Sequence, residues 1–174
     1  MADVPDGIVL KRDRDLEGRE WQVWVRRGLL ALVAALSIAA LANVFGQMPE
    51  TARASSSVAD LSIIAPTRLR GGLLWQGRFE IDAREEIKDA RLVLGTAWAK
   101  EHTINTIEPS PLGEASANGD LSLDLGHIRA GHHYILFMDF QTNPTSLGSQ
   151  KRTTDLYDGD THLLAIEQDQ IIFP

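Results

Sequence analysis

An uncharged run near the N-terminus constrains this chain more than any other feature. Residues Gly28–Phe45 (GLLALVAALSIAALANVF) carry no charge, and their only polar side chains are Ser37 and Asn43. Eighteen helical residues would extend about 27 Å, close to the roughly 30 Å of a bilayer's hydrocarbon core. We therefore expect one transmembrane α-helix over residues 28–46, whose contact partner is the lipid bilayer.

The residues around this run predict its orientation. Six Lys or Arg precede it, whereas Arg53 is the single one in the twenty residues that follow. Trp21 and Trp24 also lie where amphipathic rings favour the membrane interface. Because cations resist translocation, residues 1–27 are predicted to be a cytoplasmic tail, and the C-terminal part is predicted to lie outside the plasma membrane of a single-pass protein.

Two other readings of the apolar run compete with a retained signal anchor. A cleaved signal peptide would use small residues such as Ala52-Arg53-Ala54 or Ala40-Leu41-Ala42, but the 27-residue charged leader is long and the apolar run exceeds the usual length. A buried helix of a soluble protein would normally show a polar face, which this run lacks. The signal anchor is therefore favoured.

The remainder of the chain divides by composition into a linker and a domain. Pro, Ser and Ala without an apolar period predict a flexible linker over residues 47–59. From Ser55 to Pro174 the chain has ten basic and seventeen acidic residues, so this domain lacks the basic surface that nucleic acid requires. The chain contains no cysteine, which excludes disulfides, thiolate nucleophiles and sulfur-ligated zinc.

Residues 60–174 follow a period of two, which is typical of strands with one buried face. In residues 74–82, Trp75, Phe79 and Ile81 share one side. The segment His133–Gln141 is apolar on both sides and is predicted to be a central strand covered on both faces. Further strands are expected at 61–65, 90–95, 102–107, 121–125, 152–157, 162–167 and 171–173, separated by turns such as Asn118-Gly119 and Asp158-Gly159. This spacing predicts an all-β fold, a β-sandwich of seven or eight strands.

The turn chemistry of one stretch resembles a known family. Residues 118–131 (NGDLSLDLGHIRAG), followed by a long apolar strand, resemble the bacterial immunoglobulin-like repeats of surface proteins, with Ile128 in a position that is usually Leu. Asp60-Leu61, Pro66 and Gly71-Gly72 also suit that pattern, so the resemblance covers most of Asp60–Pro174. It implies an immunoglobulin-like sandwich that acts as a spacer, an adhesion module or a partner-binding module. The lack of tandem repeats argues against a stalk.

Candidate chemical groups are few. His127, His132 and His133 are close in sequence, with Asp139 beyond them, but neighbouring strand residues point to opposite faces and cannot share a metal without a bulge. The segment Asp155–Asp160 lacks the length and the final Glu of a calcium loop, and its Asp-Gly pair is typical of a hairpin. We therefore predict no catalytic, cofactor-binding or metal-binding residue and no cofactor.

The sequence supports three functional hypotheses. The leading one is a membrane-anchored extracytoplasmic binding or scaffolding module, an accessory subunit of another membrane or envelope protein, with Thr103–Pro111 as a candidate recognition loop. The alternative is a membrane-anchored metal-dependent hydrolase with a site near His132/His133 and Asp155/Asp160. A third is a regulator that signals through a short charged helix over residues 13–24.

Overall fold

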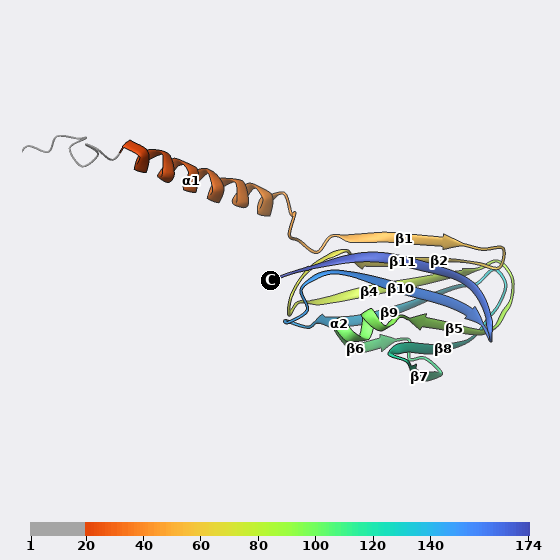
Figure 1. The fold of residues 1–174 in the computed structure, drawn as a ribbon. Coiled ribbons are helices and arrows are strands. Elements are labelled where there is room, and N and C mark those ends of the chain that lie inside the picture. The colour runs from red at the N-terminus through yellow and green to blue at the C-terminus, as the bar shows by residue number, and fades with distance from the viewer. Residues whose placement is uncertain (1–19) are drawn as a thin grey trace, which may run out of the picture. The chain divides into compact units, whose positions relative to one another are not determined.

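The computed structural model describes residues 20–174, so most of the predicted cytoplasmic tail 1–27 lies outside the described residues. The chain divides into two compact units, Met1–Val44 and Phe45–Pro174. The first contributes a helix and the second a β-domain, and each is described by itself (Figure 1).

The helix α1 spans Glu20–Leu41. Of the described residues, Trp21–Leu41 is the one helical stretch long and apolar enough to cross a membrane. It begins before the expected residue 28, because the residues that precede the apolar run, including Arg26 and Arg27, are also helical. It ends short of the expected residue 46 because Asn43 adopts a left-handed backbone with φ of 57°, and Asn is one of the few residues that tolerates this conformation after a helix end.

Two sheets form the β-domain and confirm the predicted all-β sandwich (Figure 1). One sheet, here sheet A, has the strand order β1-β2-β4-β9-β6, and the other, sheet B, has the order β3-β11-β10-β5-β8-β7. Sheet A consists of β1 (Pro49–Ser55), β2 (Ala59–Pro66), β4 (Leu74–Ala83), β9 (His133–Thr142) and β6 (His102–Glu108). Sheet B consists of β3 (Arg68–Arg70), β11 (Thr161–Phe173), β10 (Gly148–Asp158), β5 (Ile87–Leu94), β8 (Asp120–Ile128) and β7 (Gly113–Ala117).

Aromatic side chains fill one part of the core between the sheets. Trp75 of β4 stacks on Phe140 of β9 with ring centroids 4.5 Å apart. Trp98 packs against both Phe79 and Phe140 at 5.4 and 5.3 Å. It comes from the short helix α2 (Thr96–Glu101), which links β5 in sheet B to β6 in sheet A. The period of two in β4 therefore correctly predicted Trp75, Phe79 and Ile81 as one inward face, all of them buried.

The start of the domain differs from the expected flexible linker over residues 47–59. Residues 49–55 form β1, which pairs with β2 from Pro49↔Pro66 to Ser55↔Asp60. Ala52 and Ala54 are partly buried and pack against the core. The inward face of β1 carries small alanine side chains and no large apolar residue, so the sequence shows no hydrophobic alternation here.

The remaining differences concern strand number and one face. The described residues 20–174 form eleven strands instead of seven or eight. The strands β1, β3 and β7 were not predicted, and residues 162–167 and 171–173 belong to the single strand β11. The strand β9 is central, as expected, but it is not covered on both sides. Its Ile135 and Phe137 face outward and are half-buried, beside β4 residues that include the Arg78–Glu80 ion pair.

Candidate functional site

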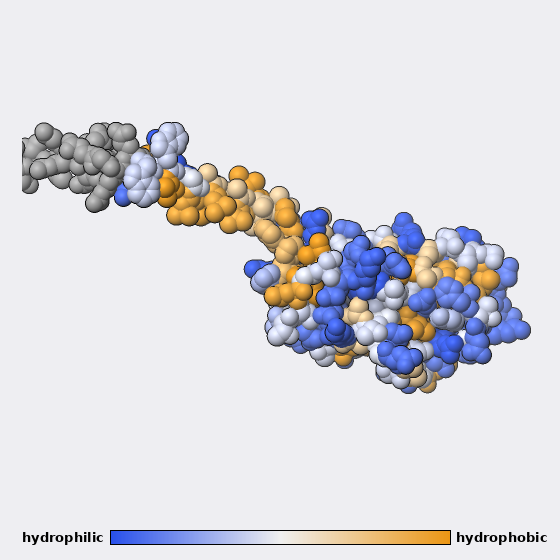
Figure 2. All heavy atoms as spheres, in the orientation of Figure 1, coloured by the Kyte–Doolittle hydropathy of each residue, from blue (hydrophilic) through white to orange (hydrophobic). Residues whose placement is uncertain are grey.

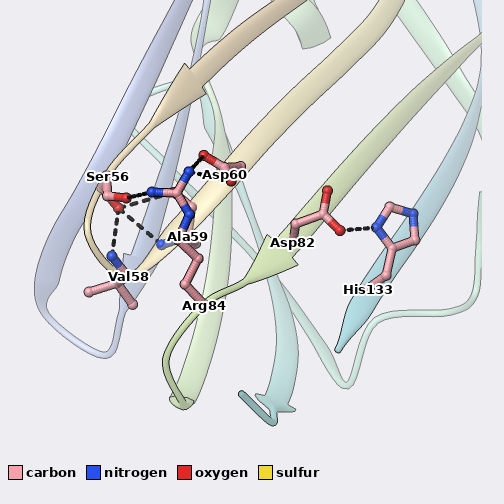
Figure 3. Close-up of polar contacts among 7 residues, drawn as sticks. All are labelled: Ser56, Val58, Ala59, Asp60, Asp82, Arg84 and His133. Atoms are coloured by element: carbon pink, nitrogen blue, oxygen red, sulfur yellow. Dashed lines mark hydrogen bonds and ion pairs between the residues drawn. The ribbon is translucent and has the colours of Figure 1, made fainter. Parts of the chain in front are cut away.

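The histidines singled out from the sequence lie at one end of the domain but do not form a metal site. His127, His132 and His133 line a shallow hollow of about 330 Å³. Within it, the Nε2 atom of His127 is 2.8 Å from Glu86, and His133 pairs with Asp82 of the adjacent strand β4 (Figure 3). In residues 20–174, no three His, Asp or Glu side chains come close enough together to hold a metal ion.

The carboxylates that the hydrolase alternative requires have other partners. Asp139 accepts a hydrogen bond from Gln76 at 2.9 Å, and Asp155 lies 2.9 Å from His162 on its own hairpin. Asp160 is 3.6 Å from Arg91. Asp155 belongs to sheet B whereas His133 belongs to sheet A, so the structure does not gather the groups into one pocket.

Figure 3 also shows a group of hydrogen bonds around Arg84. Arg84 donates to both carboxylate oxygens of Asp60 at 2.7 Å and to the carbonyl of Ser56 at 2.9 Å. A hydrogen bond with Ser55, together with Arg84, holds the pKa of Asp60 below its usual value. These contacts join the β1–β2 turn to the end of β4, and their role is structural.

The predicted recognition segment Thr103–Pro111 borders a groove at the opposite margin of the sheets from β1. Most of it forms β6, the outer strand of sheet A, and β7 is the outer strand of sheet B on the same side (Figure 1). The groove between them has a volume of about 530 Å³. It is lined by Ala99, Ile104, Asn105, Thr106, Ile107, Ser110, Pro111, Glu114, Ser116 and Leu121.

A bulge in β6 gives this groove its apolar floor. Ile104 pairs with Phe140 and Thr106 with Asp139, so Asn105 is an extra residue without a counterpart in β9. In a regular strand, residues three positions apart point to opposite faces. The extra residue brings Ile104 and Ile107 to the same side, where both are half-buried against the core and line the groove.

A buried polar cluster contacts the aromatic core, and it was not predicted from the sequence. The guanidinium of Arg152 is 4.3 Å from the ring centroid of Trp98 and 5.6 Å from that of Trp75. It donates one long hydrogen bond, 3.4 Å to the carbonyl of Pro66, and its Nε and Nη1 atoms have no hydrogen-bond partner within the described part of the chain. Burial lowers the pKa of Arg152 to about 9, so it remains charged at neutral pH.

His102 occupies the same cluster as a neutral side chain. Gln170 donates from Nε2 to the carbonyl of Pro66 at 3.1 Å, so its Oε1 accepts from Nε2 of His102 at 2.8 Å. Burial lowers the pKa of His102 to about 4. The hydrogen bond to Gln170 acts against this shift, and the positive charge of Arg152 adds to it. The alternation of β10 could have revealed the cluster, since Arg152, Thr154 and Leu156 share one buried face.

Comparisons with known proteins do not assign the chain to a family. No protein-family model matches it, and no curated protein does either. Among solved structures, a non-cellulosomal cohesin from Archaeoglobus fulgidus is similar, at 12% identity and a TM-score of 0.40 over 61% of this chain and 85% of that chain. The CARDB domain of a Pyrococcus furiosus protein gives 12% identity and a TM-score of 0.38 over 68% of this chain and 97% of that chain. Likeness at this level carries no argument about function, and membership of the immunoglobulin-like repeats stays a prediction.

Proposed function

We propose that this chain is a membrane-anchored binding module whose outer domain takes up an extended segment of a partner protein along β6. The observation that carries the proposal is an outer strand, uncharged over Thr103–Ile107, beside a groove with an apolar floor. The anchor is α1, which has the length and composition of a membrane span. The Lys and Arg residues before α1 favour an extracytoplasmic position for the domain. The partner in this proposal is another membrane or envelope protein.

The outer strands β1, β3 and β6 differ in the features that keep a sheet edge from pairing with another chain. Natural sheet edges are commonly protected by charges, proline or a very short strand. The strand β1 begins with Pro49 and carries Glu50 and Arg53, and β3 has three residues of which two are arginines. In β6, by contrast, Thr103–Ile107 (TINTI) is uncharged and rich in β-branched residues, which favour extended structure.

Edge pairing and groove contacts would act together on one ligand. When a peptide adds to a sheet edge, main-chain hydrogen bonds provide affinity and alternate side chains enter neighbouring pockets to provide specificity. The groove volume of about 530 Å³ lies in the range of small-ligand pockets, and its floor of Ile104, Ile107 and Leu121 favours apolar side chains. The bulge at Asn105 limits the length of regular pairing, which would favour one short segment over open-ended association.

The test is a charge placed on the proposed edge, with a matched charge on the opposite edge. Thr106 of β6 and Thr51 of β1 are both exposed threonines on outer strands, and each lines a groove of its own. We expect Thr106→Lys to remove a stoichiometric partner that co-purifies with the full chain from gently solubilised native membranes, whereas Thr51→Lys retains it. Equal retention by both variants, or equal loss, would contradict binding at β6.

A further inference from the structure

Four segments of the β-domain meet at the end where the domain begins and are here called the apolar end: residues 45–49, 70–74, 143–148 and 171–174. The amide of Gly71 donates to the carbonyl of Phe173 at 2.8 Å, and the rings of Phe45 and Phe173 are in edge contact with centroids 5.6 Å apart. The amide of Gly72 donates to Thr142 at 3.0 Å, at the start of the β9–β10 loop. These contacts hold the four segments together as one surface.

The composition of the apolar end departs from that of the rest of the domain. Its four segments contain no Asp or Glu, and Arg70 is their one Lys or Arg, although residues 55–174 include seventeen acidic side chains. Leu74 is 64% exposed, Met48 57% and Leu147 49%. Figure 2 shows apolar residues at this end of the domain, which in Figure 1 is the end that carries the C-terminus.

A short stretch of chain connects the apolar end to α1. The helix α1 ends at Leu41, and Phe45 already belongs to the β-domain. Four Cα–Cα steps of about 3.8 Å separate the two residues, so they stay within about 15 Å of each other in any arrangement of the two units. If α1 spans the bilayer, the apolar end is therefore the part of the domain that cannot leave the membrane surface.

We infer that the apolar end docks on the lipid surface, with Met48, Leu74 and Leu147 entering the interfacial region of the outer leaflet. This inference rests on the proposed membrane anchor. Exposed apolar side chains partition into this region. A surface without Asp or Glu side chains lowers repulsion by anionic headgroups, which Arg70 would attract. A large exposed apolar surface otherwise marks a site that is covered in the working protein.

The absence of cysteine allows a direct test with single-cysteine variants of the full chain. Leu74→Cys and Leu147→Cys would be labelled with an environment-sensitive fluorophore (NBD) and reconstituted into vesicles of phosphatidylcholine and phosphatidylglycerol, with or without nitroxide-labelled lipid. Leu112→Cys is the matched control, because Leu112 is a leucine that is 78% exposed between β6 and β7, outside the apolar end. Leu32→Cys reports on α1.

We expect blue-shifted emission and strong lipid quenching at positions 74 and 147, several-fold above that at position 112. Quenching at Leu32→Cys with no excess at 74 and 147 would overturn the docking and leave the membrane anchor standing. A blue shift at 74 and 147 without lipid quenching would indicate burial against protein, such as a second copy, and would also overturn it. Absence of quenching at Leu32→Cys would remove the anchor itself, and the proposed function with it.

Discussion

His102 and Arg152 lie where a β-sandwich ordinarily places aliphatic side chains. Both are buried between the sheets, and Gln170 connects His102 to the carbonyl of Pro66. A buried guanidinium with one long hydrogen bond costs free energy through desolvation, which its contacts with Trp75 and Trp98 offset in part. The cluster therefore gives the domain a core whose stability depends on protonation.

The first prediction is that the domain becomes less stable as the pH falls from about 6.5 to about 4. In this range the unfolded chain protonates His102 whereas the folded domain does not, because its pKa is lowered to about 4. This contribution to stability is complete above the ordinary pKa of 6.5 and is lost by about pH 4. At about 1.4 kcal/mol per pKa unit it amounts to at most about 3.5 kcal/mol. Arg152 and Glu101 are the charged groups that act on this histidine.

The measurement compares chemical unfolding of the full chain in detergent with that of His102→Gln, followed through tryptophan fluorescence. Glutamine retains an amide that can donate to Gln170 but has no titration in this range. The difference in unfolding free energy between the two proteins isolates His102 from the many surface carboxylates. It should shrink between pH 7 and pH 4, and a constant difference would show that His102 does not titrate with a lowered pKa.

At the scale of elements, β1 makes a testable contribution to the domain. Ala54 lies partly buried against the core, whereas its neighbour Arg53 is exposed. We expect Ala54→Asp to destabilise the domain by about 1–3 kcal/mol, because a carboxylate would be pressed against apolar side chains. Arg53→Asp should stay within about 0.5 kcal/mol of the parent.

Thermal unfolding of the two variants in detergent measures this contrast. If residues 47–59 were a flexible linker, both substitutions would be neutral. Equal melting temperatures for Ala54→Asp and the parent chain would therefore contradict an ordered β1.

Strands that carry large alternating side chains could be predicted from the sequence, and those without them could not. Trp75, Phe79 and Ile81 fixed β4, and the Asp158-Gly159 turn fixed the β10–β11 hairpin. The strands β1 and β7 (GEASA) contain small and polar residues, so neither shows an apolar period. The segment Thr103–Pro111 stays a predicted recognition segment. The groove beside it depends on β7 and on the bulge at Asn105, which are properties of strand pairing and not of local sequence.

At the scale of the whole molecule, the two proposed surfaces are compatible with each other. The strand β6 begins at His102, which pairs with Thr142 next to the apolar end, and it runs away from that end toward Glu108. A domain docked through its apolar end would therefore present β6 along its side. A partner anchored in the same membrane could then reach the edge laterally, at the raised local concentration that confinement to a membrane provides.

This arrangement requires the domain and the tail to lie on opposite sides of the membrane, which labelling of single cysteines can test. Leu112→Cys in the domain should react with a membrane-impermeant maleimide in intact cells because Leu112 is exposed. Ala2→Cys should react only after the cells are permeabilised, since the six cations before the apolar run favour a cytoplasmic N-terminus. The reverse pattern would contradict the orientation, and a mature chain without its first residues would show instead that the apolar run is a cleaved signal peptide.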